Sequence, residues 1–205
     1  MDHFEFVFFN QSNFKKTTGN PTSINYLNKA EFNLICTTED SHVCLWDLKQ
    51  KNPLIKRIYV SSERLVCSSF GDSMLATAGE SRSVYMIDSS SWCVSDVWSN
   101  CSKYEITSID FPKANESLVY VSGLNSEILC GSWKNKKGLP KRRLKERNKS
   151  FKADSNWIGI KQNESNGDLI GITETGNLYI IENPISLEIK SQDESPKKNH
   201  KNQKK

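Results

Sequence analysis

Apolar and polar residues alternate along this chain in short runs, which are separated by clusters of Gly, Asp, Asn and Ser. Four segments share one pattern, an apolar run followed by a tight polar turn and a second alternating run: residues 32–48, 73–88, 117–133 and 168–183. Alternation with a period of two, rich in β-branched and aromatic residues, predicts strands. The turn residues predict that each segment is a β-hairpin.

Further strand-like segments flank these hairpins. One precedes each hairpin, at residues 22–27, 64–70, 105–111 and 156–160, and a more polar one follows three of them, at residues 54–60, 92–98 and 185–189. Units of three to four short strands that recur about every 40–45 residues are typical of β-propeller blades. We therefore predict an all-β chain with a lead-in at 1–21 and about four propeller blades, at 22–62, 63–103, 104–152 and 153–190. An all-β sandwich with evenly spaced hairpins is the alternative.

The predicted repeat has marks at its turns and strand ends. Glycines are expected in three turns, at Gly79, Gly123 and Gly176, and the third strands are expected to end at Trp46-Asp47, Asp88 and Trp133. With these marks, residues 22 to about 190 resemble WD-repeat proteins. The Gly-His that often opens such a repeat is absent, so the buried His–Asp network of well-formed repeats is not expected. The resemblance implies a rigid, non-enzymatic platform that holds protein partners.

Two stretches resemble a particular branch, the family of WD repeat-containing protein 73. Residues 8–39 place Phe14-Lys15, Gly19, Ser23-Ile24 and Leu27 ahead of an apolar strand. Residues 80–91 begin an apolar third strand with Arg-Ser and end it with Asp-Ser. This resemblance implies a cytoplasmic scaffold that supports assembly of the Integrator RNA endonuclease heterodimer and associates with the cytoskeleton at spindle poles. Such a protein should close a ring of about seven blades. Four-bladed propellers exist, so a closed ring is one alternative. We favour a partial or truncated ring, whose open blade faces would take a partner or a second copy of the chain.

Charge gives a second hypothesis. The 205-residue chain has 28 Lys and Arg against 24 Asp and Glu, and ten of the basic residues lie at 134–152, between the third and fourth blades. This basic insertion is a solvated loop, a nuclear-import signal or a phosphate-contacting arm; its candidate contact residues are Lys136, Lys137, Lys141, Arg142, Arg143, Lys145 and Arg147. The third interpretation makes the protein an RNA- or ribosome-assembly-associated propeller, with weak, salt-sensitive RNA contact. The Lys-rich tail at 191–205 is expected to be disordered.

No pattern in the chain points to catalysis, and we expect no enzyme activity, no cofactor and no metal site. The six cysteines lack C-x-x-C spacing and are expected to be small buried hydrophobes in a reducing compartment. His42 is expected to be a surface or cap histidine, and Asp47, Asp88 and Glu182 to be turn formers. Trp98 and Trp133 either pack between blades or anchor a partner. No apolar run reaches the roughly 20 residues of a membrane span, so the expected location is the cytoplasm, or in part the nucleus.

Overall fold

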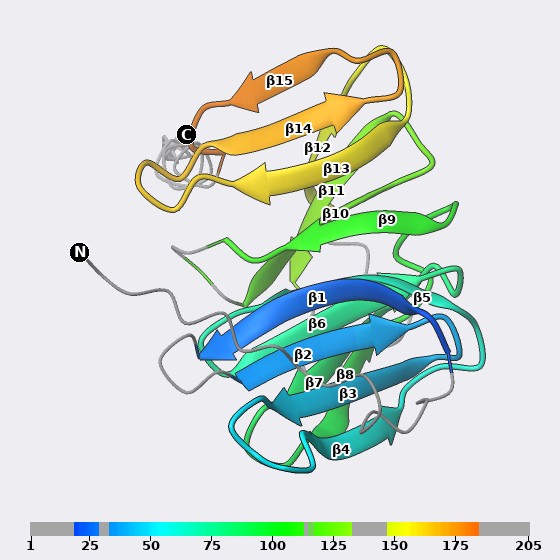
Figure 1. Ribbon diagram of the computed structural model, residues 1–205. Helices are drawn as coiled ribbons and strands as arrows, with labels where there is room; N and C mark the ends of the chain where they lie inside the picture. Colours follow the sequence, from blue (N-terminus) through cyan, green and yellow to red (C-terminus); the bar gives the residue numbers. More distant parts are fainter. Residues whose placement is uncertain (1–18, 29–32, 113–114, 116, 133–146, 185–205) are drawn as a thin grey trace, which may run out of the picture. The chain divides into compact units, whose positions relative to one another are not determined.

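The computed structural model describes residues 19–28, 33–112, 115, 117–132 and 147–184, and these residues form fifteen β-strands and no helix (Figure 1). The chain divides into two compact units, residues 1–106 and 107–205. Each unit contains two antiparallel sheets, and consecutive strands are neighbours in every sheet. The sheets are the four predicted blades.

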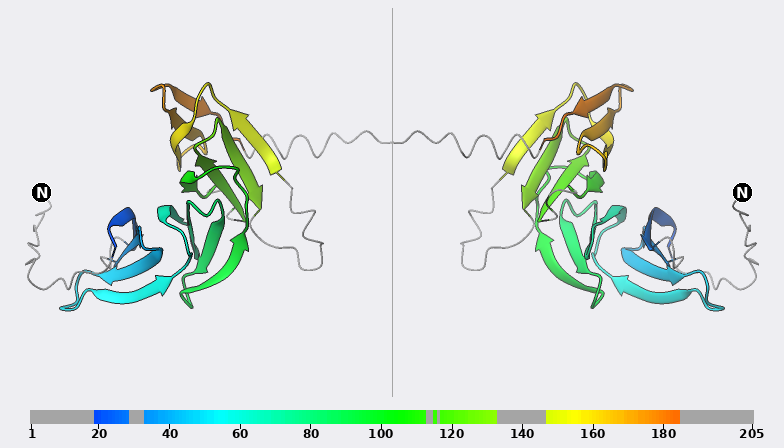
Figure 2. Two further views of the ribbon diagram at one scale, coloured as in Figure 1. Left: turned by 90° about the vertical axis from the view of Figure 1, so that its right-hand side faces the viewer. Right: turned by 90° about the vertical axis from the view of Figure 1, so that its left-hand side faces the viewer.

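Unit 1 holds the first two blades. Blade 1 consists of β1 (Pro21–Asn28), β2 (Asn33–Thr38), β3 (His42–Asp47) and β4 (Leu54–Tyr59). Blade 2 consists of β5 (Leu65–Phe70), β6 (Met74–Gly79), β7 (Val84–Asp88) and β8 (Cys93–Trp98). The two sheets lie side by side, as the views in Figure 2 show.

Unit 2 holds the other two blades. Blade 3 consists of β9 (Ile106–Asp110), whose first residue closes unit 1, with β10 (Leu118–Gly123), β11 (Glu127–Ser132) and β12 (Arg147–Lys152). Blade 4 is described as three strands, β13 (Trp157–Gln162), β14 (Leu169–Thr173) and β15 (Leu178–Ile181). The strand expected at 185–189 lies outside the described residues, as does the tail at 191–205.

The strand β12 was missed by the sequence analysis, which placed residues 134–152 in an insertion. Glu127 pairs with Lys152 and Gly131 pairs with Arg147 in the antiparallel ladder, so the last six residues of that segment form the outer strand of blade 3. Charged residues, Lys especially, are common on strands at the edge of a sheet. Because this strand has that composition, it lacks the alternating apolar pattern that predicts a buried strand.

A separate apolar core lies within each unit. In unit 1, side chains on the side of blade 1 that faces blade 2 pack against blade 2; the buried members of this cluster are Ile35, Val43, Leu45, Leu65, Leu75 and Ile87. In unit 2, blades 3 and 4 pack through Leu118, Tyr120, Ile128, Cys130, Trp157, Ile160 and Leu169. Burial of a side chain of this size contributes about 1.5–3 kcal/mol. The core between neighbouring blades therefore holds each pair of sheets together.

Polar side chains join the first strands of neighbouring blades. In unit 1, Ser23 Oγ lies 2.9 Å from Ser68 Oγ, and Asn25 Nδ2 donates to the Ser68 carbonyl oxygen at 3.1 Å. In unit 2, Thr107 Oγ1 donates to the Trp157 carbonyl oxygen at 3.1 Å. These first strands have no ladder partner on one edge, and the side-chain bonds satisfy part of that edge.

Of the three glycines predicted in turns, only Gly176 has the left-handed backbone of a turn residue. Gly176 has φ +82° in the β14–β15 turn, where the left-handed backbone favours glycine. In the β6–β7 turn the left-handed residue is Arg82, with φ 58°, whereas Gly79 ends β6. A Cβ at Gly79 would lie 2.2 Å from the Arg64 carbonyl oxygen, so glycine is needed there for close approach of two backbones. Gly123 likewise ends a strand, β10.

The aspartates at the ends of β3 and β7 cap the turns that follow. Asp47 Oδ1 accepts the Lys49 N–H at 2.9 Å, and Asp88 Oδ1 accepts the Ser90 N–H at 2.9 Å. The Ser90 backbone and hydroxyl bonds hold the pKa of Asp88 below its ordinary value. A carboxylate that accepts the N–H two residues on is an Asx turn, which fixes the exit direction of the chain.

Candidate interaction face on blade 1

The side of blade 1 that faces away from blade 2 carries apolar and aromatic side chains; we call it the open face of blade 1. Cross-strand register puts its members in three rows: Tyr26–Leu34–Trp46, Ile24–Cys36–Cys44–Arg57 and His42–Tyr59. Ile24, Tyr26 and Tyr59 are 66%, 57% and 62% exposed, respectively. The alternation in β1 to β3 places one apolar set in the core and a second set on this face.

Trp46, the tryptophan of the Trp46-Asp47 pair, is half-buried near the middle of this face. Its indole Nε1–H donates to Cys36 Sγ at 3.4 Å, which fixes the ring against β2. Trp46 is thus a pre-positioned, partly exposed aromatic ring. A rigid aromatic side chain loses little conformational entropy on binding, which is why such residues dominate the energetics of protein interfaces.

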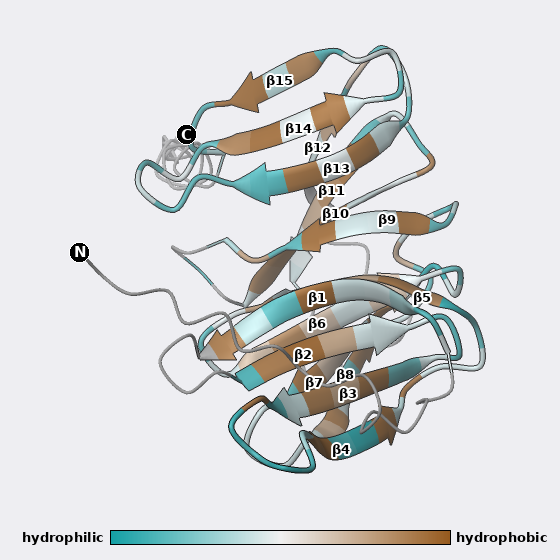
Figure 3. Ribbon diagram, viewed as in Figure 1, coloured by the Kyte–Doolittle hydropathy of each residue, from teal (hydrophilic) through white to brown (hydrophobic). Residues whose placement is uncertain are grey.

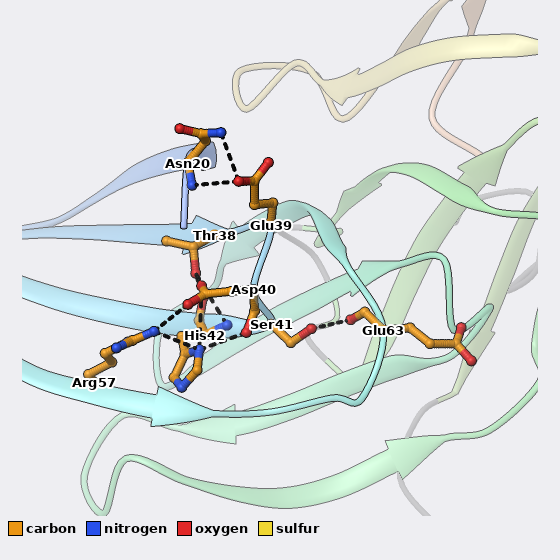
Figure 4. A network of polar contacts seen from close by, with 8 residues as sticks. All are labelled: Asn20, Thr38, Glu39, Asp40, Ser41, His42, Arg57 and Glu63. Carbon is orange, nitrogen blue, oxygen red and sulfur yellow. Dashed lines mark hydrogen bonds and ion pairs between the residues drawn. The ribbon is translucent and has the colours of Figure 1, made fainter. Parts of the chain in front are cut away.

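A network of polar contacts holds one end of the open face of blade 1, at the β2–β3 turn (Figure 4). Asp40 accepts a hydrogen bond from Thr38 Oγ1 at 2.5 Å and forms an ion pair with Arg57 on β4. His42 Nδ1 lies 2.7 Å from the Asp40 carbonyl oxygen and donates to it. The His42 ring meets the Tyr59 ring edge-on, with 5.4 Å between ring centroids. One turn is thereby tied to the outer strand of the blade.

The same turn is attached to the segments on either side of it. Ser41, with φ 68°, donates through Oγ to the Glu63 carbonyl oxygen at 2.6 Å. Asn20 donates from its backbone N and from Nδ2 to Glu39 Oε1, at 3.2 and 2.7 Å. The Asp40–Arg57 pair is about one-third exposed, so its own contribution to stability is small. Its effect is to order the turn, because it fixes side chains from two strands in one geometry.

The approach of Asp40 to His42 was not predicted from the sequence. Asp40 Oδ1 lies 3.4 Å from His42 Nδ1, and only Ser41 separates the two residues in the sequence. The signal was present in the sequence Asp-Ser-His, because a tight turn brings residues i and i+2 together. Asp40 is already neutralised by Arg57, so the arrangement orders a turn and leaves no unpaired carboxylate to act as a base.

Blade 4 has a second apolar surface on the side that faces away from blade 3; we call it the open face of blade 4. Register places its members on one side of the sheet: Ile170, Ile172, Leu178 and Ile180. Leu178 and Ile180 are 64% and 62% exposed. Much of β14 and β15 is brown in Figure 3, the colour that marks hydrophobic residues. A contiguous apolar surface of this kind marks an interaction site more often than scattered apolar residues do.

A cluster of hydrogen bonds at one end of blade 4 centres on Asp154. Its carboxylate accepts bonds from Thr175 Oγ1 at 2.8 Å, Asn177 Nδ2 at 2.8 Å and the Tyr179 hydroxyl at 2.9 Å. These donors, Thr175 first, lower the pKa of Asp154 to about 2, and the bond to Asp154 raises the pKa of Tyr179. Like Asp40 in blade 1, Asp154 has its lone pairs engaged by a turn and orders that turn.

The remaining predicted site residues lie outside this face. Arg147 begins β12, whereas Trp133 and the other six basic candidates (Lys136, Lys137, Lys141, Arg142, Arg143 and Lys145) lie outside the described residues. Trp98 ends β8 and is buried, so it packs within the protein. Within the described ranges, no group of three or more His, Cys, Asp or Glu could hold a metal ion. The described part of the chain also contains no helix long and apolar enough to span a membrane.

The cysteines are only partly as expected. Cys44, Cys67, Cys101 and Cys130 are buried, and all six are free thiols. Cys93 is exposed and Cys36 is half-buried, so these two are not the small buried hydrophobes that were predicted. Burial of Cys67 and Cys101 raises the pKa of each thiol, to about 12 for Cys101.

Comparison with known proteins identifies the fold. No family model matches the sequence, and no curated protein matches it significantly. Among solved structures, the chain is similar to the WD40 β-propeller domain of Doa1, with a TM-score of 0.62 and 12% sequence identity. The match covers 78% of this chain and 50% of the Doa1 chain, so the chain spans about half the length of that propeller. The predicted WD-repeat-like β-propeller fold is confirmed.

Proposed function

We propose that this protein is a non-enzymatic scaffold that holds a protein partner on the open face of blade 1. The WD40-type fold supports this proposal, since such propellers generally serve as platforms for protein–protein interaction. The observation that carries it is the exposure of Ile24, Tyr26 and Tyr59 around the fixed Trp46 ring. Aromatic residues in a rigid frame are the usual hot spots of protein interfaces.

The chemistry of this face indicates the character of the partner. Its main charged side chains, Asp40 and Arg57, neutralise each other at one end of the face. Arg57 ends a row whose other members are Ile24, Cys36 and Cys44, and the neighbouring row of Tyr26, Leu34 and Trp46 is apolar. We therefore expect the docking surface of the partner to be apolar, without a requirement for opposite charge. Binding by such a surface should depend weakly on salt, because screening acts on unpaired exposed charges.

Affinity capture of the tagged chain from cytosol, with nuclease and at physiological salt, would identify partners by mass spectrometry. Each captured protein is then purified and titrated directly against the wild type, the Ile24→Ser/Tyr59→Ser variant and a Tyr104→Ala control. Tyr104 is also an exposed aromatic residue of unit 1, but it follows β8 and lies outside this face. The proposal is supported if the double variant binds at least tenfold more weakly than the wild type while the Tyr104→Ala control binds as the wild type does. Equal affinity of all three, or capture of chaperones alone, contradicts it.

The resemblance to the family of WD repeat-containing protein 73 supports a more specific proposal. The partner would be the Integrator RNA endonuclease heterodimer, whose assembly the protein would assist in the cytoplasm, with association to the cytoskeleton. Recovery of both endonuclease subunits, with direct binding to the purified chain, supports this assignment. Recovery of other proteins by the same face leaves the scaffold function intact and rejects the Integrator role.

RNA binding is the second candidate function, and the ten basic residues at 134–152 favour it. The role in RNA or ribosome assembly would use Lys141, Arg142 and Arg143 as phosphate contacts. Changing these three residues to Glu should abolish retention of RNA while leaving protein partners bound. The slope of log affinity against log salt should fall with the number of contacts removed. Unchanged RNA retention in this variant rejects the second candidate.

We propose that the open face of blade 4 also takes the open face of blade 1 of a second copy of the chain, in competition with the protein partner for that face. Within each unit, one side of a blade packs on the opposite side of the next blade. The open face of blade 4 corresponds to the side of blade 1 that packs on blade 2, and the open face of blade 1 corresponds to the side of blade 2 that receives it. Two copies of the chain have about the length of the Doa1 propeller. We therefore expect head-to-tail association, measured by sedimentation over a range of concentrations. Ile172→Glu should shift the chain to monomer, and Tyr104→Glu should not; a monomeric wild type at all concentrations contradicts this expectation.

A further inference from the structure

Two cysteines lie directly opposite each other on the open face of blade 1. Cys36 on β2 and Cys44 on β3 are partners in the antiparallel register, and both are free thiols. Directly opposite residues in an antiparallel pair have Cβ atoms about 4.5–5.5 Å apart. A disulfide requires a Cβ–Cβ separation of about 3.5–4.5 Å. A small closure of the two strands would therefore bring the sulfurs within bonding distance.

The surroundings of Cys36 favour its thiolate. The Cys44 thiol donates a hydrogen bond to Cys36 Sγ, and the Trp46 indole N–H donates a second one at 3.4 Å. These donors, Cys44 first, lower the pKa of Cys36 to about 7 although partial burial opposes the shift. Cys36 is also half-exposed, so a small oxidant can reach it. A thiolate that is stabilised and accessible is the reactive form of cysteine.

Cys44 is suited to a different step. It is 1% exposed, and the bond to Cys36, together with burial, raises its pKa. Cys44 therefore stays protonated and unreactive toward an oxidant in solution. Its sulfur nevertheless lies against Cys36, so it can act on that residue once Cys36 has been oxidised. This division into an exposed attacking thiolate and a protected second thiol is the arrangement that redox-sensing cysteine pairs use.

We propose that Cys36 and Cys44 form a peroxide-sensitive pair that closes to a cross-strand disulfide. The Cys36 thiolate attacks one oxygen of hydrogen peroxide; the S–O bond forms, the O–O bond breaks, and the leaving hydroxide takes up a proton to become water. Cys36 is then a sulfenic acid. The Cys44 sulfur, losing its proton, attacks the Cys36 sulfur; the S–S bond forms and the S–O bond breaks, releasing a second water. Two thiols are oxidised and one peroxide is reduced.

The disulfide would change the centre of the open face of blade 1. Oxidation replaces the thiolate that accepts the Trp46 indole N–H with a disulfide sulfur, a weaker acceptor, so this hydrogen bond to the ring is weakened. The cross-link also joins the two strands that lead into the Asp40 turn. Redox state would thereby alter a partner's affinity for this face, a consequence that rests on the proposed function. Formation of the disulfide does not depend on that function.

The test uses the purified, reduced full-length chain treated with equimolar hydrogen peroxide. Cleavage after Glu39 separates the two cysteines unless a disulfide joins them, so mass spectrometry shows the linked peptides and the loss of two hydrogen atoms. The Cys44→Ser variant should accumulate a Cys36 sulfenic acid, which dimedone traps. Cys44→Ala is a second variant, used if serine at this position perturbs the fold. The exposed Cys93 is the control thiol, and Cys93→Ser should leave the linkage unchanged.

Thiol reactivity gives a measurement that needs no variant. The rate of alkylation of Cys36 in the wild type should rise with a midpoint near pH 7, whereas Cys67 and Cys101 should react only after unfolding because they are buried. Linked Cys36–Cys44 peptides together with this midpoint establish the pair. A midpoint at the ordinary value of about 8.5 overturns the proposal. So does oxidation of Cys36 to the sulfinic acid without the linkage, or faster oxidation of Cys93.

Discussion

Replacement of Gly171 by alanine tests how blade 4 packs on blade 3. A Cβ at this position would lie 2.4 Å from Cζ3 and 2.8 Å from Cε3 of Trp157, whereas carbon atoms pack at about 3.5–4.0 Å. Trp157 is almost fully buried and cannot move freely. Its Nε1–H donates to the Ser126 carbonyl oxygen at 3.0 Å, and its ring meets the Tyr179 ring with 5.3 Å between centroids.

The expected cost follows from these contacts. Forcing one extra carbon into a packed core costs about 1–3 kcal/mol, and displacing the indole from its hydrogen bond costs about 0.5–1.5 kcal/mol more. Gly171→Ala should therefore lower the free energy of unfolding by about 2–4 kcal/mol. Gly159 on the adjacent strand is the matched control, because a Cβ there meets nothing within 4 Å. Gly159→Ala should be neutral or stabilise by about 0.4–1 kcal/mol.

The assay is urea denaturation followed by far-UV circular dichroism, with hydrogen exchange of peptides from residues 157–181 to assign the change to blade 4. Trp157→Leu should remove the clash, so the double variant with Gly171→Ala should be more stable than the sum of the two single changes predicts. The coupling should be about 1 kcal/mol or more, within the range seen for residues in contact. Equal stability of Gly171→Ala and wild type, or additive effects in the double variant, would refute the reasoning.

Two other perturbations follow from the same structure. Gly79→Ala should destabilise unit 1 by about 3 kcal/mol or more, because its Cβ meets the backbone carbonyl of Arg64 at 2.2 Å and no side chain can move aside; unchanged exchange protection of β5 and β6 would contradict this. Acid should weaken blade 4 through Asp154, whose pKa is lowered from 3.8 to about 2 in the folded state. Its contribution is complete above about pH 5 and is lost as the pH falls through the folded-state pKa. Asp154→Asn should flatten that part of the pH dependence of the unfolding midpoint, and an unchanged slope would argue against the assigned bonds.

The strands and their grouping could be predicted from the sequence because they depend on local properties. Alternation of apolar and polar residues defines a strand with two different sides, and a turn residue between two such runs fixes a hairpin. The spacing of the hairpins then indicated blades. The role of Asp47 as a turn former also follows from its neighbours, since its bond partner is Lys49, two residues away.

The tertiary structure decided which side of each sheet is buried and which residues meet across strands. Cys36 and Cys44 are eight positions apart in a sequence without any cysteine motif, and only the register of β2 and β3 places them opposite each other. The requirement for glycine at Gly79 comes from the approach of the backbone at Arg64, and not from a turn. The outer strand β12 is recognised by its ladder to β11. Backbone dihedrals and side-chain alternation are properties of neighbouring residues, whereas register and close approach arise from contacts between residues far apart in the chain.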